Sequence, residues 1–549
     1  MLNLKIKPEN IGWLLAFALV ALAYFFGLFI DLTGDSALYS AITRQMVESG
    51  DWFNLKINGV PYDQKPHLFF WLAGIGVQLF GYTNFAFKLF PFLYGLAAIY
   101  FTYRLGKQLY SAEAGKLAAL FTLTSQMVFL YFFDFHTDSI LQTGVVLALW
   151  QLAAYLQTKK SIHFVISFVG VGLAMMTKGP VGAVLPFFAV LFYLLAQKKF
   201  RQIFHPKWIL GIAISFLVVS PALIHLYSSF GLEGLKFFFI TNNIGRITGE
   251  YAGSSTDYFY YTYNAIWAFL PWTLWSVSAL VMEFTEWLKK KNADANGVFL
   301  IGGTLLFIII LSVARGKAPN YFLITIIPFS VLTGKWISGW CSLTEQIQRI
   351  LGRMQFVFVA FLTVALIFVL WVFRWNSIWL SLLSFILVIL FLLTPVILKT
   401  TFRNQLILSS VIVIGSLNLF LNTKVLPGLF RFQGARQVLS IFERESSEGS
   451  QLCNFEVEQY ELFFYSKGNV GQIHDWEELK KKMAQPGTWL YTNEVKYYDI
   501  LKMNFQIEKV YEIKYRGMNR VNFAFLNPNT REKALKTNYL IVIGDSTHY

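Results

Sequence analysis

The sequence is poor in charge and in cysteine. Only 14% of its 549 residues are charged, whereas 56% are hydrophobic and 18% are aromatic. This balance excludes a soluble protein, which must cover its surface with polar groups. The two cysteines, Cys341 and Cys453, fall on opposite sides of the membrane in the topology derived below, so no internal disulfide is expected. The composition predicts a protein of the lipid bilayer, without internal repeats or low-complexity tracts.

The net charge of +15 does not indicate a nucleic-acid partner. Lys and Arg stand in short clusters between apolar runs, such as Lys198, Lys199, Arg201 and Lys207. This arrangement is typical of the cytoplasmic loops of membrane proteins.

About thirteen apolar runs are long enough to cross a bilayer. They lie near 11–30, 83–103, 114–133, 139–157, 161–176, 180–197, 208–228, 262–285, 298–313, 320–340, 355–373, 377–397 and 405–422. The first run follows Lys5 and Lys7 as a signal peptide would, but it is long enough to span and Asp31 follows without a cleavage site, so we expect a retained helix. A cytoplasmic N-terminus then places every basic cluster inside.

Two segments fall outside this series of spans. Counting the apolar stretch 67–80 as a crossing would move the basic clusters outside, so we predict an interfacial or re-entrant helix on the outer surface. Residues 424–549 are polar, with strand-like runs near 488–491, 521–525 and 539–543. The predicted fold is a polytopic α-helical membrane domain over 1–423, with its catalytic first outer loop at 31–82, followed by a small extracytoplasmic α/β domain over 424–549.

The polar residues that cytoplasmic loops do not explain gather at the predicted outer helix ends. They are Asp31 and Asp35, 62–65, 134–138, Lys178, 242–246 and 315–317. Cations there run against the positive-inside bias and invite a functional explanation. A cavity with cations, carboxylates and aromatic walls suits an amphiphile with a phosphate head: Lys and Arg stabilise a phosphate leaving group, and a carboxylate activates an attacking hydroxyl.

An ordered set of short motifs carries a resemblance to a known family. The set comprises Asp35-Ser-Ala-Leu-Tyr39, Gly50-Asp-Trp52, Tyr62-Asp-Gln-Lys65-Pro66, Thr137-Asp138, Thr177-Lys178-Gly-Pro180, Asn243-Ile-Gly-Arg246, Phe269-Leu-Pro-Trp272 and Arg315-Gly-Lys317-Ala-Pro-Asn-Tyr321. It resembles the bacterial relatives of protein O-mannosyltransferases, most closely the aminoarabinose transferases that modify lipid A. The resemblance implies a C-type glycosyltransferase fold with about thirteen transmembrane helices.

The same resemblance implies roles for individual residues. Asp35 becomes the candidate general base or acceptor-orienting carboxylate, with Asp138 as the second acidic residue. The residues expected to bind the carrier phosphate and sugar are Tyr62, Lys65, Lys178, Arg246, Arg315, Lys317 and Tyr321.

The chain departs from the family pattern at four positions. Ser36 and Leu38 stand where a Glu and an Arg are usual, and Gln64 and Asn243 replace the Glu and His that bind zinc in the aminoarabinose transferase. We therefore expect no metal site and no cofactor requirement for catalysis, and a structural zinc is doubtful. Asp134 has a weaker claim to a role than Asp138, and five histidines without shared spacing are predicted to be structural: His67, His136, His163, His205 and His225.

Each candidate also has a structural alternative. Asp35 and Asp138 could cap the helices that follow them, Lys65 could extend to the membrane surface, and Lys178 could interact with a helix dipole. Arg315 and Lys317 could anchor lipid headgroups.

The sequence thus predicts an inner-membrane glycosyltransferase. It would move a sugar from a polyprenyl-phosphate donor to lipid A, another glycolipid or a protein at the outer face, with no nucleic-acid partner. A transporter or flippase of lipid-linked sugars and a non-catalytic anchoring protein remain alternatives.

Overall fold

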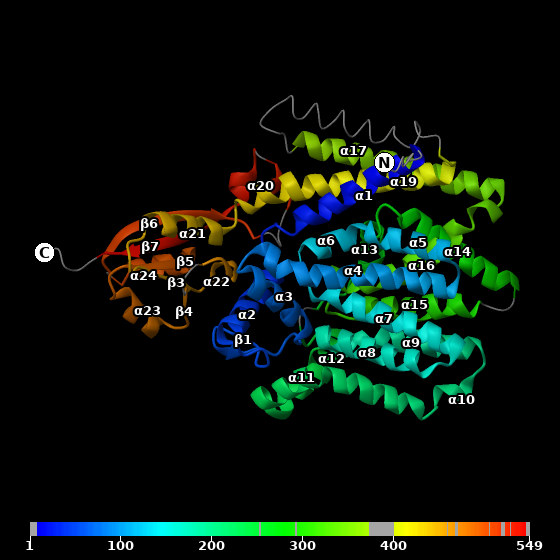
Figure 1. Ribbon diagram of the computed structural model, residues 1–549. Helices are drawn as coiled ribbons and strands as arrows, with labels where there is room; N and C mark the ends of the chain where they lie inside the picture. The colour runs from blue at the N-terminus through cyan, green and yellow to red at the C-terminus, as the bar shows by residue number, and fades with distance from the viewer. Residues whose placement is uncertain are drawn as a thin grey trace, which may run out of the picture.

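The computed structural model describes residues 8–134, 136–251, 254–290, 294–372, 400–457, 459–466, 470–503, 505–517, 522–527 and 529–544. Long helices run side by side through most of the molecule, and a small sheet lies beyond one end of the bundle (Figure 1). Nine spans in the described part of the chain are long and apolar enough to cross a membrane. Their main helices are α1 (Pro8–Gly27), α4 (Asn84–Leu109), α7 (Thr137–Thr158), α8 (Ser161–Lys178), α11 (Lys207–Lys236), α15 (Ala295–Val313), α16 (Ile326–Ser338), α17 (Glu345–Val372) and α19 (Phe402–Phe420).

Two further apolar segments are bent pairs, and one is short. Helices α5 (Ala112–Leu123) and α6 (Gln126–Phe133) meet at 54°, and α13 (Tyr260–Ala268) and α14 (Thr273–Lys290) meet at 118°. Pro271, which lacks a backbone N–H, lies at the second break. Helix α9 (Val181–Ala196) is the short one. Each predicted span falls on one of these elements except 377–397, which lies outside the described residues.

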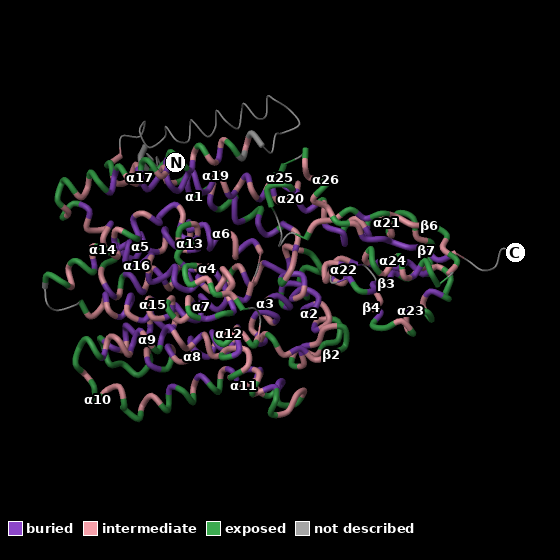
Figure 2. Tube along the Cα trace, turned by 180° about the vertical axis from the view of Figure 1, so that it is seen from behind, coloured by how far each residue is buried: buried purple, intermediate pink, exposed green. Residues whose placement is uncertain are grey.

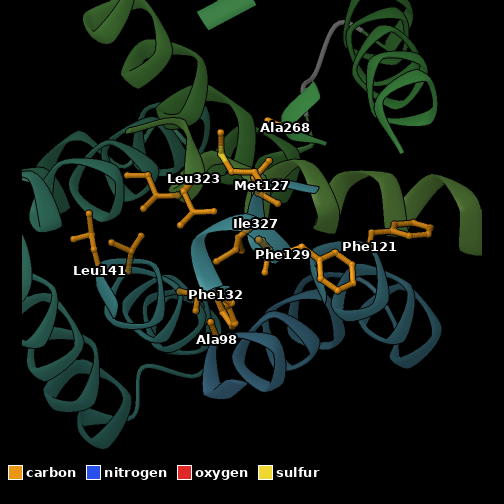
Figure 3. Close-up of a cluster of buried hydrophobic side chains, with 14 of the residues drawn as sticks. Ala98, Phe121, Met127, Phe129, Phe132, Leu141, Ala268, Leu323 and Ile327 are labelled. Atoms are coloured by element: carbon orange, nitrogen blue, oxygen red, sulfur yellow. The ribbon is translucent and has the colours of Figure 1, made fainter. Parts of the chain in front are cut away.

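The bundle core is built from aromatic and aliphatic side chains of α4, α5, α6, α7 and the segment around α16. Phe121, Phe129 and Phe132 lie among the side chains labelled in Figure 3, and all three are buried. Close helix approach depends on small residues: a Cβ on Gly106 of α4 would lie 2.8 Å from the Cα of Gly115 on α5. Small residues allow the same close packing of helices within membranes.

The outer helices turn apolar side chains away from the protein. Burial concentrates in the central helices, while α11 and the outer face of α1 are largely exposed (Figure 2). The exposed fractions of Leu217 and Ile224 on α11 are 74% and 65%. An apolar exterior of this kind is stable in lipid, not in water.

The 31–82 segment lies at the end of the bundle nearest the sheet (Figure 1). It contains α2 (Asp35–Ser49), the two-stranded hairpin β1 (Lys56–Ile57) and β2 (Val60–Pro61), and α3 (Leu68–Phe80). At 13 residues, α3 is too short to cross a bilayer, in agreement with the sequence prediction that it is not a span.

The polar C-terminal region forms a mixed five-stranded sheet in the order β4-β3-β5-β7-β6. Its strands are β3 (Gln451–Phe455), β4 (Gly471–Ile473), β5 (Thr488–Asn493), β6 (Ile507–Tyr515) and β7 (Lys536–Ile543), and its helices are α21 (Gly434–Glu445), α22 (Glu461–Tyr465), α23 (Trp476–Met483) and α24 (Glu494–Leu501). Strand β3 runs parallel to β4 and β5, whereas β7 is antiparallel to β5 and β6.

Two of the three strand-like runs in this region are confirmed. The runs near 488–491 and 539–543 are β5 and part of β7. The prediction near 521–525 is wrong for its described residues: α25 (Phe523–Leu526) is a helix turn, because the Asn522 side chain accepts the backbone N–H of Phe525 at 3.0 Å and caps it.

The sheet region is fixed to the 31–82 segment by hydrogen bonds. The Arg44 guanidinium on α2 donates to the carbonyl oxygens of Phe463 and Phe464, each at 3.1 Å. The Tyr465 hydroxyl accepts the backbone N–H of Leu32 at 2.8 Å, and the Gln433 amide donates to the Leu32 carbonyl at 3.1 Å. These contacts set the position of the residues around Asp35.

Candidate active site

Asp35 is the first residue of α2 and presents its carboxylate to open space. Its side chain is 61% exposed. The preceding Gly34 has a φ of 55°, which glycine adopts without a Cβ clash, and it occupies the N-cap position. The capping alternative for Asp35 is therefore wrong, because Asp35 lies inside the helix and no side chain caps this end.

His136, which was predicted to be structural, stands beside Asp35. The Nδ1 atom of His136 lies 3.9 Å from the Asp35 carboxylate, and its Nε2 lies 3.1 Å from the carboxylate of Asp134. Asp134 also accepts a short hydrogen bond from the Ser36 hydroxyl. Asp134 and His136 lie in the three-residue connection between the end of α6 at Phe133 and the start of α7 at Thr137, and no periodic pattern reveals that they meet.

The charge of this group follows from its surroundings. Burial lowers the pKa of His136, but the neighbouring Asp134 and Asp35 carboxylates more than offset it, and the net pKa is raised. The imidazole lies between two carboxylates that both favour its protonated form, and one of them is Asp35.

Five of the predicted residues meet in a second place, a cavity of about 210 Å³. They are Lys65, Asp138, Lys178, Arg246 and Tyr321. The Arg246 guanidinium donates to the Tyr321 hydroxyl at 2.5 Å, and the Lys178 ammonium lies 4.4 Å from the centre of the Tyr321 ring. The aromatic ring thus separates two cations that both face the cavity.

Asp138 is bound on both of its carboxylate oxygens. Oδ1 accepts from the Lys178 ammonium at 2.5 Å, and Oδ2 accepts from the Asn320 amide at 2.7 Å. The side chain is 2% exposed. It does not cap a helix, because α7 begins at Thr137 after His136 at the N-cap position. Asp138 therefore holds Lys178 in place, which leaves Asp35 as the more accessible carboxylate.

Lys65 is the cation best placed to meet a ligand. Its ammonium donates to the Gln64 carbonyl at 3.4 Å, and within the described ranges it has no ion-pair partner. Burial, then the positive charges of Lys178 and Arg246, lower the pKa of Lys65 to about 8, although Asp35 and Asp138 act in the opposite direction. A buried cation among other cations is stabilised by an anion.

Besides Asp35, three predicted residues lie outside this cavity. The Tyr62 hydroxyl is buried and has no hydrogen-bond partner among the described residues, and burial, followed by the Asp35 and Asp63 carboxylates, raises its pKa well above the usual value. The Lys317 ammonium donates to the carbonyls of Ser312 and Ala314, each at 2.7 Å, and so binds the end of α15. Arg315 is exposed. The structure does not gather Arg315 and Lys317 with the other cations.

An apolar groove of about 500 Å³ adjoins the cavity. It lies between α8, α9 and α11, and Val184 of α9 lines both the groove and the cavity. A ligand with a charged head in the cavity could therefore extend an apolar chain along α9.

The positions of the usual zinc ligands have other contacts. The Asn243 amide donates to the Phe238 carbonyl at 2.8 Å. Over the part of the chain that the structure describes, no three His, Cys, Asp or Glu side chains gather as a metal site. Independence from metal remains a prediction.

Known proteins are similar to this chain in sequence and in architecture. Residues 64–225 match the family described as dolichyl-phosphate-mannose-protein mannosyltransferase. An undecaprenyl phosphate-alpha-4-amino-4-deoxy-L-arabinose arabinosyl transferase of Pectobacterium atrosepticum is 28% identical over 336 residues, which cover 59% of this chain and 58% of that protein. One of Pseudomonas fluorescens is 26% identical over 331 residues, 59% of each chain.

The fold is shared over nearly the whole chain. The crystal structure of ArnT from Cupriavidus metallidurans bound to undecaprenyl phosphate superposes with a TM-score of 0.75 at 18% identity and covers 96% of this chain and 98% of the other. The apo form of the same protein gives a TM-score of 0.73 at 17% identity, covering 97% and 98%. The fold is that of a multi-pass membrane protein, as predicted. These findings confirm the resemblance predicted from the motifs: the chain is similar to the protein mannosyltransferases and the aminoarabinose transferases.

Proposed function

We propose that this protein transfers a glycosyl group from a polyprenyl-phosphate donor to an acceptor hydroxyl at the extracytoplasmic face of the inner membrane. One observation carries the proposal: Lys65, Lys178 and Arg246 line one small cavity that adjoins an apolar groove. A phosphate with a long apolar tail satisfies both surfaces at once. The relatives named as undecaprenyl-phosphate-dependent transferases support the same class of donor.

The reaction follows from the two parts of the site. The acceptor oxygen forms a bond to the anomeric carbon while the bond between that carbon and the phosphate oxygen breaks. The electron pair leaves with the polyprenyl phosphate, whose charge Lys65, Lys178 and Arg246 stabilise. The acceptor proton passes to the Asp35 carboxylate. His136, which Asp134 holds in place, supplies a neighbouring positive charge to Asp35 when it is protonated, and Asp138 positions Lys178.

The division of labour between Asp35 and Lys65 provides the test. Asp35→Asn should retain binding of polyprenyl phosphate but lose turnover, because a base acts on the transition state. Lys65→Ala should weaken binding about ten- to a hundredfold, the value of a charge-assisted contact. Lys65→Arg should recover part of the lost affinity, because the guanidinium restores the positive charge but differs in shape from the ammonium.

Both quantities are measurable on purified protein in detergent, with Glu477→Gln on the exposed surface of α23 as the control variant. Near-normal transfer by Asp35→Asn would remove Asp35 as the base. Translocation of an intact lipid-linked sugar without release of polyprenyl phosphate would identify a flippase instead.

A further inference from the structure

A second polar cavity, of about 570 Å³, lies between the 31–82 segment and the sheet region. One wall is the chain from Thr33 to Leu38, with Asp35 in it, and the opposite wall includes Gln433, Glu456 and Glu461. Among the described lining residues, none is shared with the cation cavity. Asp35 therefore lines a polar cavity that faces the sheet region and is distinct from the cation cavity.

A buried amide oxygen in this wall has no partner. Gln433 is only 5% exposed, and its amide nitrogen donates to the Leu32 carbonyl, but its Oε1 accepts no hydrogen bond from any described residue. The Oε1 of Gln459, which also lines the cavity, is in the same condition. Buried acceptors without partners are rare, and a ligand that donates hydrogen bonds would satisfy these two once their side chains rotate toward the cavity.

The charged groups of the cavity point to the same ligand chemistry. Asp35 and Glu456 supply carboxylates, whereas burial raises the pKa of the third acidic side chain, Glu461, to about 7. The cation among the described lining residues is Arg516, whose guanidinium donates to the Ala534 carbonyl at 2.8 Å. A wall rich in carboxylates and amide oxygens accepts hydrogen bonds and repels anions.

Backbone conformation fixes two parts of this wall. Glu456 has a φ of 56°, unusual for a residue with a Cβ, and the Asn493 amide holds its carbonyl at 2.9 Å. The Gln433 amide on the far wall donates to the carbonyl of Leu32, three residues before Asp35, at 3.1 Å. The two walls are thereby tied together across the cavity.

We propose that this cavity binds the acceptor substrate. The acceptor is a hydroxyl-rich glycan, and the part of it that enters the cavity is uncharged or carries an amine and has no phosphate group. One of its hydroxyls would lie at Asp35 while the donor phosphate occupies the cation cavity. The inference rests on the proposed function, because it takes Asp35 as the base, and it adds a substrate class to it.

Binding of defined saccharides to the full-length protein in detergent tests the proposal. The probe is a β1,4-linked glucosamine disaccharide that carries a photoactivatable diazirine, with cross-links mapped by peptide mass spectrometry. We expect cross-links in 456–461 and 515–517. We expect competition by the uncharged methyl cellobioside, and none by glucosamine 1-phosphate at equal concentration.

Two cavity variants and one control give the comparison. Glu456→Gln keeps the shape of the side chain and removes its charge, so affinity for the disaccharide should fall about tenfold. Gln433→Met removes the unpaired oxygen and should weaken binding of both saccharides. The matched control, Glu477→Gln on α23, lies outside the cavity and should change nothing.

Donor binding in the same samples separates the possible failures. If glucosamine 1-phosphate competes better than the uncharged disaccharide, if a Ser/Thr peptide displaces the probe and the disaccharides do not, or if neither variant changes affinity, the acceptor assignment is overturned. If Lys65→Ala leaves polyprenyl phosphate binding unchanged, the proposed function itself fails, whatever the saccharides do.

Discussion

At the scale of single residues, the site contains one lysine that is paired with a carboxylate and one that has no ion-pair partner within the described ranges. Lys178 is paired with Asp138, whereas Lys65 has only a weak bond to a carbonyl within the described ranges. A lysine with a pKa near 8 titrates close to physiological pH. Binding of the donor phosphate should therefore respond to alkaline pH through Lys65.

Binding of polyprenyl phosphate should weaken as pH rises through and above 8. Lys65 is charged below its pKa of about 8 and loses its proton above it, so binding must then include uptake of a proton. The dissociation constant should rise by up to about tenfold per pH unit above 8. Titrations at pH 7, 8 and 9 measure it. Lys65→Arg, which stays charged, should give a flatter profile, and an equally steep one would assign the effect to another group.

His136 should influence turnover more than donor binding. Asn at this position can keep a hydrogen bond to Asp134 but cannot carry the charge beside Asp35. We expect His136→Asn to lower kcat about tenfold, the effect of one lost charge-assisted contact, with little change in the dissociation constant for polyprenyl phosphate. The groups that face His136 are Asp134, Asp35 and, at longer range, Asp138.

The same variant changes the pH dependence of stability. The pKa of His136 is raised in the folded protein, so its contribution is fully present below the ordinary histidine value near 6.5 and is lost as pH rises through the raised value. The wild type should lose thermal stability from pH 6 to 8 by more than His136→Asn does. Parallel curves would show that the imidazole remains neutral.

The sequence predicted the cation cavity better than the surroundings of the base. Lys65, Lys178, Arg246 and Tyr321 come from separate elements, yet the order of their motifs allowed them to be grouped. Asp134 and His136 follow no spacing rule, because a short irregular connection between two helices places them. The proximity of Gln433 to Leu32 joins residues about 400 positions apart, which local patterns do not encode.

At the scale of secondary structure elements, Lys178 of α8 and Asp138 of α7 join two neighbouring helices. Lys178→Met would leave the Asp138 carboxylate buried without its cation, at a cost of about 3–5 kcal/mol in the free energy of unfolding. The double variant Lys178→Met/Asp138→Asn should recover much of that loss, because no uncompensated charge remains. Thermal unfolding in detergent compares them. Equal stability of the single and double variants would mean that water reaches Asp138.

Element positions were the most predictable part of the fold. Apolar runs fix the helices because each must satisfy its own backbone within lipid, and so the described spans coincide with predicted ones. The bend of 118° between α13 and α14 was not predicted, since the run 262–285 reads as one apolar stretch. The error at α25 arose because an Asn cap at 522 outweighed the strand propensity of its neighbours.

At the scale of the whole molecule, we predict that the sheet region and the 31–82 segment face the extracytoplasmic side. In intact spheroplasts a membrane-impermeant maleimide should label Lys481→Cys on exposed α23, while the natural exposed Cys341 should react only after permeabilisation. Both predictions of orientation rest on the basic clusters, which are expected on the cytoplasmic side. Labelling of Cys341 alone in intact cells would invert the topology.

The hydrogen bonds between Arg44 and the carbonyls of residues 463–466 have a consequence for biosynthesis. Because the ribosome makes the chain from its N-terminus, Asp35 enters the membrane long before residues 433–538, which form the far wall of its polar cavity, have been made. A nascent chain could already bind a lipid phosphate at Lys65, but only one wall of the polar cavity around Asp35 would then exist. The polar cavity around the candidate base is therefore enclosed only when the last strands have been made and have folded.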